Sequence, residues 1–322
     1  MSWPERPVVV RAPATSANLG PGFDSLGLAL TLHDVVTARI IGSGLEIEVS
    51  GHGEETAAEG EAHLVVRAMR AAFAALGSQP PGIALQCRNT IPQGYGLGSS
   101  AAAIVAGLLA ARALASAAGL AGAPPGAPSA GRAAAAAGLP GDELLRLAAG
   151  LEGHPDNVAA CLAGGLTIAW MSADGARSAR LSPLAGLAPV LCVPPEPLAT
   201  AAARLALPAA VPHADAAQNS ARAALLIAAL TGDPELLMEA TEDFLHQRYR
   251  AAAMPQTASL VASLRSAGIP AVVSGAGPAV LALTVTGRQP GAGVAASIAA
   301  AEGAGWQASP LGVDAQGATT GQ

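Results

Sequence analysis

Lysine is absent from this sequence of 322 residues, and all 17 of its basic residues are arginine. This absence excludes three classes of chemistry. A Walker loop needs a lysine on the β- and γ-phosphates, a protein kinase needs its strand lysine, and a Schiff-base enzyme needs an amine. Any phosphate bound by this chain must therefore be held by backbone N–H groups, hydroxyl groups, arginine or a metal ion.

Charged and aromatic residues are also scarce, at 12% and 2% of the chain, and the net charge is −6. Nucleic-acid binding relies on basic surfaces and stacking aromatic rings, so we expect no nucleic-acid partner. The longest apolar stretches are alanine-rich and are broken by Gly, Pro or Arg, and Glu5 and Arg6 stand where a signal sequence would be apolar. We therefore expect no membrane partner and a cytoplasmic location.

The three cysteines, Cys87, Cys161 and Cys192, stand singly and far apart on apolar segments. Their odd number and wide spacing indicate neither a disulfide framework nor a zinc site. We expect all three to lie in the core.

Residues 92–103 carry the strongest local signal, Pro-Gln-Gly-Tyr-Gly-Leu-Gly-Ser-Ser-Ala-Ala-Ala. Its three alternate glycines leave room for a ligand, and Ser99 and Ser100 are expected to cap an alanine-rich helix over 99–118. The unpaired N–H groups of the first helical turn and the helix dipole favour an anion, so the pattern predicts a nucleotide phosphate site. A glycine-rich turn that serves only helix packing is the alternative.

Apolar patterns predict an α+β chain with a ligand cleft between two domains, 1–170 and 171–322. A strand ending near Pro13 is expected to lead into a loop over 14–24, and a Pro/Gly/Ala-rich surface excursion is expected over 119–138. The expected strands are 8–11, 35–40, 45–49, 83–87, 167–170, 190–193, 271–274 and 280–285. The other expected helices are 63–76, 142–151, one after Pro155, 198–205, 216–230, 235–244, 257–267 and 293–301.

Four segments, 12–24, 92–103, 152–157 and 274–278, resemble in order and separation the GHMP kinases, small-molecule kinases named for galactose, homoserine, mevalonate and phosphomevalonate. Within that superfamily the chain is most similar to the homoserine kinase family, from residue 8 to the ending 313–318. The resemblance implies an ATP-binding N-terminal domain of the ribosomal protein S5 domain 2-like type and a ferredoxin-like C-terminal domain. It also implies transfer of the γ-phosphate of ATP to the side-chain hydroxyl of L-homoserine, a step of threonine biosynthesis, with Mg²⁺.

The resemblance assigns ATP to the glycine-rich loop. The implied ATP-binding residues are Pro92, Gln93, Gly94, Tyr95, Gly96, Leu97, Gly98, Ser99, Ser100 and Ala101. Ser100 and Glu152 match the family's two residues beside Mg²⁺, an ion that prefers oxygen ligands. Without its motif, Glu152 would be an ordinary solvated carboxylate at a helix end.

Homoserine is a zwitterion, so its site must offer a cation and an anion. Arg204 and Arg250 align with the family's two arginines, which suit a carboxylate, and Asp24 fits the ammonium group. Asn18 and His154 align with other substrate contacts. Taken singly, Asn18 and Asp24 also fit turn formers and His154 a helix cap, while Arg250 and the nearby Arg248 also fit a solvated helix face.

The resemblance assigns catalysis to Arg250 and to Asn157, which can hydrogen-bond the reacting hydroxyl. Asp156 resembles the base of the mevalonate branch, but phosphoryl transfer depends mainly on alignment and charge neutralisation, so a structural role is favoured. The turn over 274–278 fits either a ligand contact or packing against the phosphate loop. The other histidines show no ligand spacing, and His246 is expected at most to shape the Arg250 segment.

Two other functions remain open from the sequence. One is a GHMP kinase for a different alcohol, which the charged acceptor residues disfavour. The other is a catalytically silent nucleotide sensor, which the presence of both Ser100 and Glu152 disfavours. The oligomeric state is undetermined, with a homodimer as one alternative.

Overall fold

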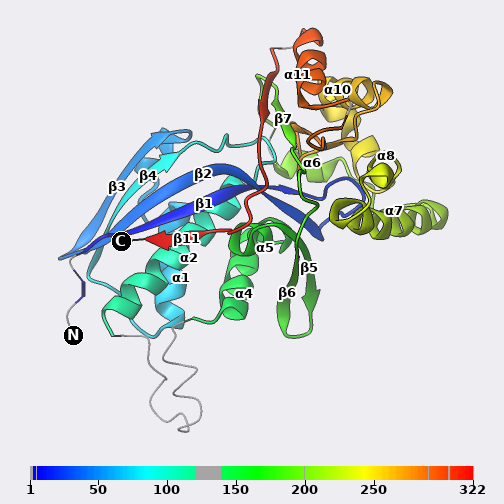
Figure 1. Cartoon of the computed structure of the whole chain (residues 1–322). Helices are drawn as coiled ribbons and strands as arrows, with labels where there is room; N and C mark the ends of the chain where they lie inside the picture. The colour runs from blue at the N-terminus through cyan, green and yellow to red at the C-terminus, as the bar shows by residue number, and fades with distance from the viewer. Residues whose placement is uncertain are drawn as a thin grey trace.

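The computed structural model describes residues 3–4, 6–119, 139–198, 200–288, 290–303 and 305–321, without the side chains of 200–202. These residues form two α+β bodies, one on each sheet, which lie side by side (Figure 1). The predicted surface excursion lies outside the described residues from residue 120 onward.

The first body is built on a seven-stranded sheet in the order β11-β1-β2-β4-β3, with β5 paired to β2 and to β6. Only β3 and β4 run parallel; the other paired strands are antiparallel. The strands are β1 (Val8–Ala17), β2 (Leu26–Ile41), β3 (Gly44–Gly51), β4 (Gly82–Asn89), β5 (Leu166–Ser172), β6 (Gly175–Leu181) and β11 (Thr319–Gly321). The sheet thus takes strands from both sides of residue 170, and β11 returns to pair with β1 (Figure 1).

Strand β1 continues beyond Pro13, so the expectation of a loop from residue 14 is wrong. The register of β1 against β2 shifts between Pro13 and Ala14, which marks an irregularity where a residue without an N–H group is tolerated. The strand then runs on to Ala17 and carries Thr15 and Ser16, both fully buried, to the edge of the functional site.

The helices of the first body lie on one face of this sheet (Figure 1). They are α1 (Leu64–Ala75), α2 (Ser99–Ala117), α4 (Gly141–Glu152) and α5 (Asp156–Ala163), with a 3-10 segment over Glu54–Ala62 before α1. A Cβ on Gly107 of α2 would lie 2.5 Å from the carbonyl oxygen of Val65, so a side chain there would push α1 and α2 apart. Helix α2 is long and apolar enough to cross a membrane by length and composition, but 67% of that stretch is buried inside the protein.

The second body is a four-stranded antiparallel sheet in the order β10-β7-β9-β8. Its strands are β7 (Val190–Val193), β8 (Ala271–Val273), β9 (Val280–Ala282) and β10 (Gln307–Pro310). Its helices are α6 (Thr200–Leu205), α7 (His213–Thr231), α8 (Leu237–Ala240), α9 (Gln247–Arg250), α10 (Pro255–Ser266) and α11 (Ala292–Ala301), with 3-10 turns over Pro234–Leu236 and Ala251–Ala253. Helices α10 and α11 pack on the sheet, and the β-α-β-β-α-β succession confirms the expected ferredoxin-like body.

The helix expected over 235–244 is interrupted. It consists of a 3-10 turn and the short α8, which ends at Ala240. The hydroxyl of Thr241 donates to the carbonyl oxygen of Leu237, and the Asp243 carboxylate accepts the backbone N–H groups of residues 245–247. Asp243 therefore starts a new turn instead of continuing the helix, a competition that short polar side chains often win.

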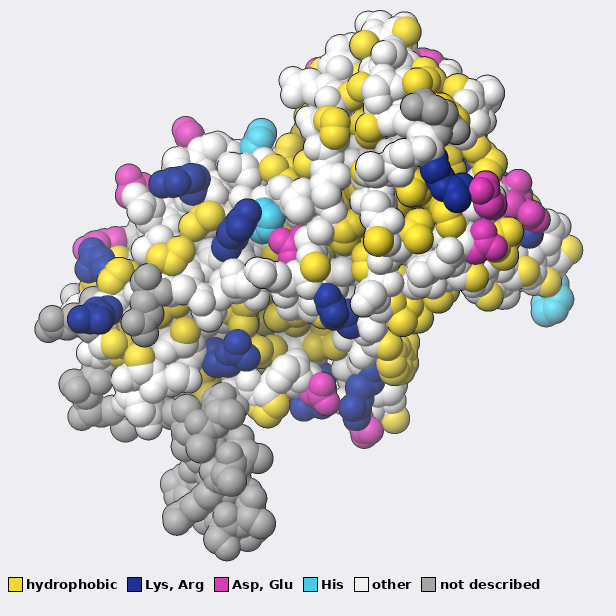
Figure 2. All heavy atoms as spheres, viewed as in Figure 1, with side chains coloured by type: hydrophobic (Ala, Val, Ile, Leu, Met, Phe, Trp, Pro, Cys, Tyr) yellow, Lys and Arg dark blue, Asp and Glu magenta, His cyan; other side chains and the backbone are white. Residues whose placement is uncertain are grey.

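The cysteines lie where the sequence predicted them. All three cysteines are free and buried, which confirms their placement in the core. Burial raises the pKa of the Cys87 thiol to about 12, so this group stays protonated near neutral pH. On the face shown in Figure 2, arginine side chains of the described residues stand apart from one another and form no continuous basic patch.

Candidate active site

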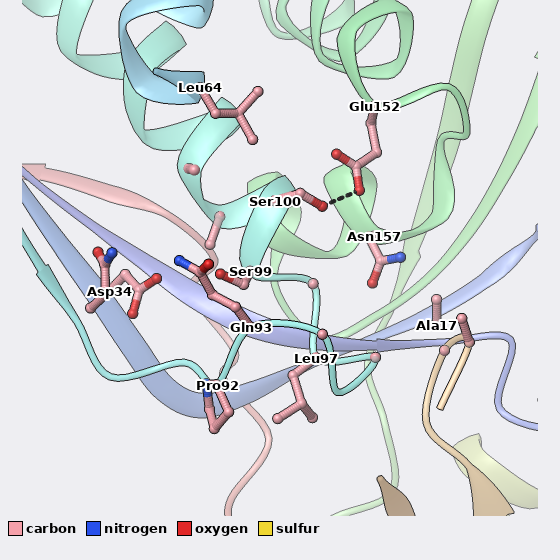
Figure 3. Close-up of a pocket in the computed structure, with 18 of the residues that line it drawn as sticks. Ala17, Asp34, Leu64, Pro92, Gln93, Leu97, Ser99, Ser100, Glu152 and Asn157 are labelled. Carbon is pink, nitrogen blue, oxygen red and sulfur yellow. Dashed lines mark hydrogen bonds between the residues drawn. The ribbon is translucent and has the colours of Figure 1, made fainter. Parts of the chain in front are cut away.

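A cleft of about 730 Å³ is lined by residues of both bodies. The first body contributes the loop after β1, the segment from Pro92 to Ser100 and the residues between α4 and α5, while the second contributes Arg204, Arg250 and the turn at Gly275. Figure 3 shows part of this cleft, with Ser100, Glu152 and Asn157 arranged around one region of it. All four segments that the sequence predicted to act together, 12–24, 92–103, 152–157 and 274–278, thus contribute residues to one cavity.

The glycine-rich loop keeps its shape by close packing. Gly94, Gly96 and Gly98 all have positive φ, at 80°, 75° and 66°. A Cβ on Gly96 would lie 2.1 Å from the carbonyl oxygen of Ser274, and one on Gly98 would lie 2.0 Å from Oγ1 of Thr15. Two of the three glycines are therefore required by neighbouring protein atoms, beyond any room that they leave for a ligand.

Neither serine caps α2, which corrects the sequence prediction. The N-cap is Gly98, and no side chain bonds to the first turn. Ser100 instead donates its hydroxyl to Oε1 of Glu152 at 2.6 Å (Figure 3). Without a side-chain cap, the N–H groups of this first turn have no side-chain partner from the N-cap residue, and helix N-termini of this kind favour anions.

Ser100 and Glu152 form a pair of hard oxygen donors at the end of α4. Burial raises the pKa of Glu152, and the hydrogen bond from Ser100 opposes this shift. Among the described residues there is no cluster of three or more Asp, Glu, His or Cys side chains that could hold a metal ion. Mg²⁺ suits such a sparse site, because it keeps several waters and takes one or two protein oxygens together with phosphate oxygens.

The far end of the cleft contains residues that the sequence analysis missed. Asp34 of β2 is 5% exposed, and its Oδ1 accepts the backbone N–H groups of Thr90 and Ile91, at 2.7 and 2.9 Å. Burial raises the pKa of Asp34, while these two hydrogen bonds lower it. The carboxylate therefore holds the chain just before Pro92, and its only sequence signal was a lone acid within an apolar strand.

The segment between β3 and α1 also reaches this end. Cleft-lining residues there that sequence reasoning missed include Thr56, Glu59, Ala62 and His63 before α1, Leu64, Val65 and Arg67 in α1, and Val36, Cys87 and Asn89 on strands β2 and β4. His63 is 5% exposed, and its Nδ1 has no hydrogen-bond partner among the described residues. No motif marks these positions, because they become neighbours of Pro92 and Gln93 only through the packing of α1 on the sheet.

Asp24 and Arg204 meet at the opposite end, although 180 residues separate them. The guanidinium donates to both carboxylate oxygens, at 2.9 and 3.3 Å, and both side chains are about two-fifths exposed. Asn18 is buried in the same loop, where it accepts the N–H of Asp24 and donates to the carbonyl oxygen of Gly275. Both Asn18 and Asp24 have positive φ, which fits the prediction that they form a turn, and both also line the cleft.

Arg250 lies beneath this pair and is 1% exposed. Its guanidinium donates to the carbonyl oxygens of Ala203 and Gly275 and to the ring of His246. Arg248 is exposed and pairs with Asp215 outside the cleft lining. Of the two arginines weighed from the sequence, Arg250 is the one that borders the cleft.

The segment after α4 is a connected polar chain. Oδ1 of Asp156 bonds to Nδ1 of His154 at 2.7 Å and accepts the N–H of Asn157. The bond to Asp156 is the main reason that the pKa of His154 is raised. Asn157 accepts the hydroxyl proton of Thr15 at Oδ1, which leaves its Nδ2 donors to the cleft.

Two of the predicted ATP-binding residues do not line the cleft. Tyr95 donates its hydroxyl to the carbonyl oxygen of Pro195, and Ala101 is fully buried in the core. The turn over 274–278 packs on the phosphate loop, since Ser274 donates to the carbonyl oxygen of Gly96, and it also borders the cleft through Gly275 and Ala276.

Comparisons with known proteins agree with this architecture. The family model for the GHMP kinases N terminal domain matches residues 63–165, and that for the GHMP kinases C terminal region matches residues 223–301. The chain is 52% identical to the homoserine kinase of Streptomyces coelicolor over 97% of this chain and 94% of the relative. It is 50% identical to that of Streptomyces avermitilis over 97% and 95%.

Solved structures give the same result. The crystal structure of homoserine kinase from Cytophaga hutchinsonii matches with a TM-score of 0.81 at 25% identity, and the match covers 99% of this chain and 98% of that one. The resemblance inferred from the four motifs is thereby confirmed. The chain belongs to the GHMP kinases and, within them, to the homoserine kinase family.

Proposed function

We propose that this protein transfers the γ-phosphoryl group of ATP to the side-chain hydroxyl of L-homoserine, giving O-phospho-L-homoserine and ADP for threonine biosynthesis. The observation that carries the proposal is a single cleft with a glycine-rich loop and an uncapped helix N-terminus at one side and opposed acidic and basic side chains at the other. The identity of 52% to a homoserine kinase over nearly the whole chain supports the same acceptor.

The phosphate side uses backbone and helix electrostatics. We infer that the first turn of α2 and the loop from Pro92 to Gly98 hold the ATP phosphates. These backbone groups would take the role that a lysine has in other phosphate-binding loops, since this chain has no lysine. Ser100 and Glu152 would hold Mg²⁺. When bound, the ion would neutralise charge that develops on the transferred phosphoryl group.

The acceptor side suits a zwitterion. Asp24 would receive the ammonium group, and Arg204 and Arg250 the carboxylate. Asp24 and Arg204 pair with each other in this structure. When homoserine binds, its ammonium group would replace Arg204 beside Asp24, and its carboxylate would replace Asp24 beside Arg204. An acceptor that carries only one of the two charges would leave one of these side chains unpaired and would bind poorly.

Activation of the hydroxyl group would depend on alignment. The Nδ2 group of Asn157 is free to donate to the reacting oxygen, since Thr15 holds the other end of the amide. Oδ1 of Asp156 is engaged by His154 and by the backbone of Asn157, which favours an orienting role over proton abstraction. A phosphoryl transfer with a loose transition state needs little more than such positioning and charge neutralisation.

The test is an ADP-release assay of the purified protein with ATP and Mg²⁺. Homoserine, homoserine without its amine, mevalonate, galactose and water are compared as acceptors. We expect turnover with homoserine to exceed that with each other acceptor by at least roughly 100-fold, because an analogue that lacks one or both charges leaves Asp24 or the arginines without a substrate partner. Equal rates with mevalonate or galactose would contradict the assignment, and no ADP above the water control would leave only a nucleotide sensor.

The cytoplasmic location and a homodimer remain predictions.

A further inference from the structure

His246 lies outside the lining of the cleft but contacts the acceptor side from behind. Its side chain is fully buried, one turn before Arg250 on the same short helical segment. One ring nitrogen lies 3.0 Å from Nη1 of Arg250, and the other lies 2.9 Å from the carbonyl oxygen of Gly20. The two contacts join segments that are 226 residues apart.

The chemistry of these partners defines the state of the ring. A guanidinium nitrogen can only donate, so Nδ1 of His246 must accept and cannot carry a proton. A carbonyl oxygen can only accept, so Nε2 must carry the proton that it donates to Gly20. Both contacts are made only by the neutral ring with its proton on Nε2.

The loop held by His246 is the one that carries Asp24. Asn219 donates to the carbonyl oxygen of Pro21 in the same loop at 2.7 Å. The ring of Phe23 lies 5.3 Å from the imidazole of His246, and the guanidinium of Arg250 lies 5.6 Å from the Phe23 ring. One imidazole thus contacts both the loop of Asp24, through Gly20 and Phe23, and the buried guanidinium of Arg250.

We propose that neutral His246 is a positioning residue for the acceptor substrate, which sets Arg250 relative to the Asp24 loop. The proposal rests on the proposed function for the identity of that acceptor. His246 touches no substrate. It acts through two hydrogen bonds. One holds the cation Arg250, and the other holds the loop that carries the anion Asp24.

The surroundings of the ring favour its neutral form. The charged groups that face it are Asp243 from the preceding turn, with its Oδ2 3.8 Å from Nε2, Arg250 from its own helix, and Asp24 from the loop after β1. Asp24 is itself paired with Arg204 of helix α6. Burial, the largest effect, and Arg250 lower the pKa of His246, and the two carboxylates raise it.

Protonation of His246 would direct an N–H group at the guanidinium of Arg250 and break that contact. Its pKa is lowered, so the neutral ring persists at neutral pH and is lost only as the pH falls below the ordinary range of histidine. We therefore expect kcat/KM for homoserine to fall on acidification.

Two substitutions separate the two hydrogen bonds. In H246N the side-chain oxygen lies near the position of Nδ1 and can still accept from Arg250. In H246Q the terminal amide reaches toward Nε2 and can donate to Gly20, but it leaves no acceptor at the Nδ1 position. H213N, at an exposed histidine, is the matched control.

Steady-state kinetics with homoserine and ATP give the main result. We expect H246Q to raise KM for homoserine roughly tenfold or more, since it removes an acceptor from a charged donor, with KM for ATP within about twofold of wild type. H246N should recover most of the loss and should lack the acid-side fall in kcat/KM that this histidine causes in the wild type and in H213N. An unchanged KM for homoserine in a folded H246Q, or equal rises for both substrates, would overturn the proposal.

Nuclear magnetic resonance of ¹⁵N-imidazole-labelled wild type tests the same idea without a variant or a substrate. We expect the Nε2–H tautomer at neutral pH and titration below the ordinary range of histidine. A proton on Nδ1 or ordinary titration would overturn the proposal. Because this measurement uses no homoserine, failure of the wild type to phosphorylate homoserine would overturn the proposed function separately.

Discussion

The two ends of the cleft are built in different ways. The end that we propose for the ATP phosphates, here called the phosphate end, consists of one continuous loop and the first turn of the helix that follows it. The hydrogen-bond donors that it offers are therefore mainly backbone N–H groups held in place by glycine packing. The acceptor end consists of charged side chains from both bodies, among them Asp24, Arg204 and Arg250. The difference indicates that a common ligand part can be bound by backbone shape, whereas the choice of acceptor requires side chains that can vary.

The largest effect is expected at Glu152, beside the phosphate end. Glu152→Gln is nearly isosteric and keeps the hydrogen bond from Ser100, but it removes the charge that would hold Mg²⁺. We expect kcat to fall roughly 100- to 1000-fold, the range typical of losing one electrostatic contact to a transition state. Circular dichroism should remain unchanged, and a fully active variant with an intact spectrum would remove Glu152 from the metal site.

Gly96→Ala tests whether packing shapes the phosphate end. The new Cβ would lie 2.1 Å from the carbonyl oxygen of Ser274 at a φ of 75°, so we expect a loss of at least about 3 kcal/mol in the free energy of unfolding. Gly77→Ala is the matched control, because Gly77 has a φ of 74° but no atom within 4 Å of a Cβ. It should lose only ~1 kcal/mol. Equal losses in urea unfolding would mean that backbone strain, and not the contact, decides.

Arg250→Lys tests the acceptor end. Lysine keeps the charge but loses the planar set of donors that reaches Ala203, Gly275 and His246. We expect KM for homoserine to rise about 10- to 100-fold, with KM for ATP nearly unchanged. Arg248→Lys, at an exposed position, should leave both constants near wild type. The opposite pattern in the two variants would move the predicted contact to Arg248.

The smallest effect is expected at Asp156. If positioning dominates, Asp156→Asn should keep kcat within about tenfold of wild type, because a general base contributes roughly 100-fold or more. The bond to Asp156 is the main cause of the raised pKa of His154, so this pKa should fall in the variant, as measured by the titration of its NMR signals. A loss of several orders of magnitude with an intact fold would instead make Asp156 a base.

At the acceptor end, the sequence predicted which residues take part but not which side chains contact one another. Arg204 and Arg250 were predicted as cations, and both border the cleft, but nothing near Arg204 in sequence indicated that it pairs with Asp24. His246 was expected at most to shape the Arg250 segment, and its hydrogen bond to the Arg250 side chain was not predicted. The resemblance selected Arg250 over the nearby Arg248, but taken singly both also fitted a solvated helix face. Burial separated them, and burial depends on contacts with residues far away in the chain.

The sequence by itself determined the parts of this protein that local chemistry governs. Glycines at 94, 96 and 98, the alanine-rich helix after them and the absence of lysine predict a site that holds phosphate by backbone groups, because turn conformation and helix dipoles depend on adjacent residues. Only the tertiary structure decided that Ser100 bonds to Glu152, that Asp34 holds the chain before the loop and that two glycines are required by packing. Those outcomes depend on hydrogen bonds and close contacts between distant segments, whose geometry exists only after the sheet and its helices have packed together.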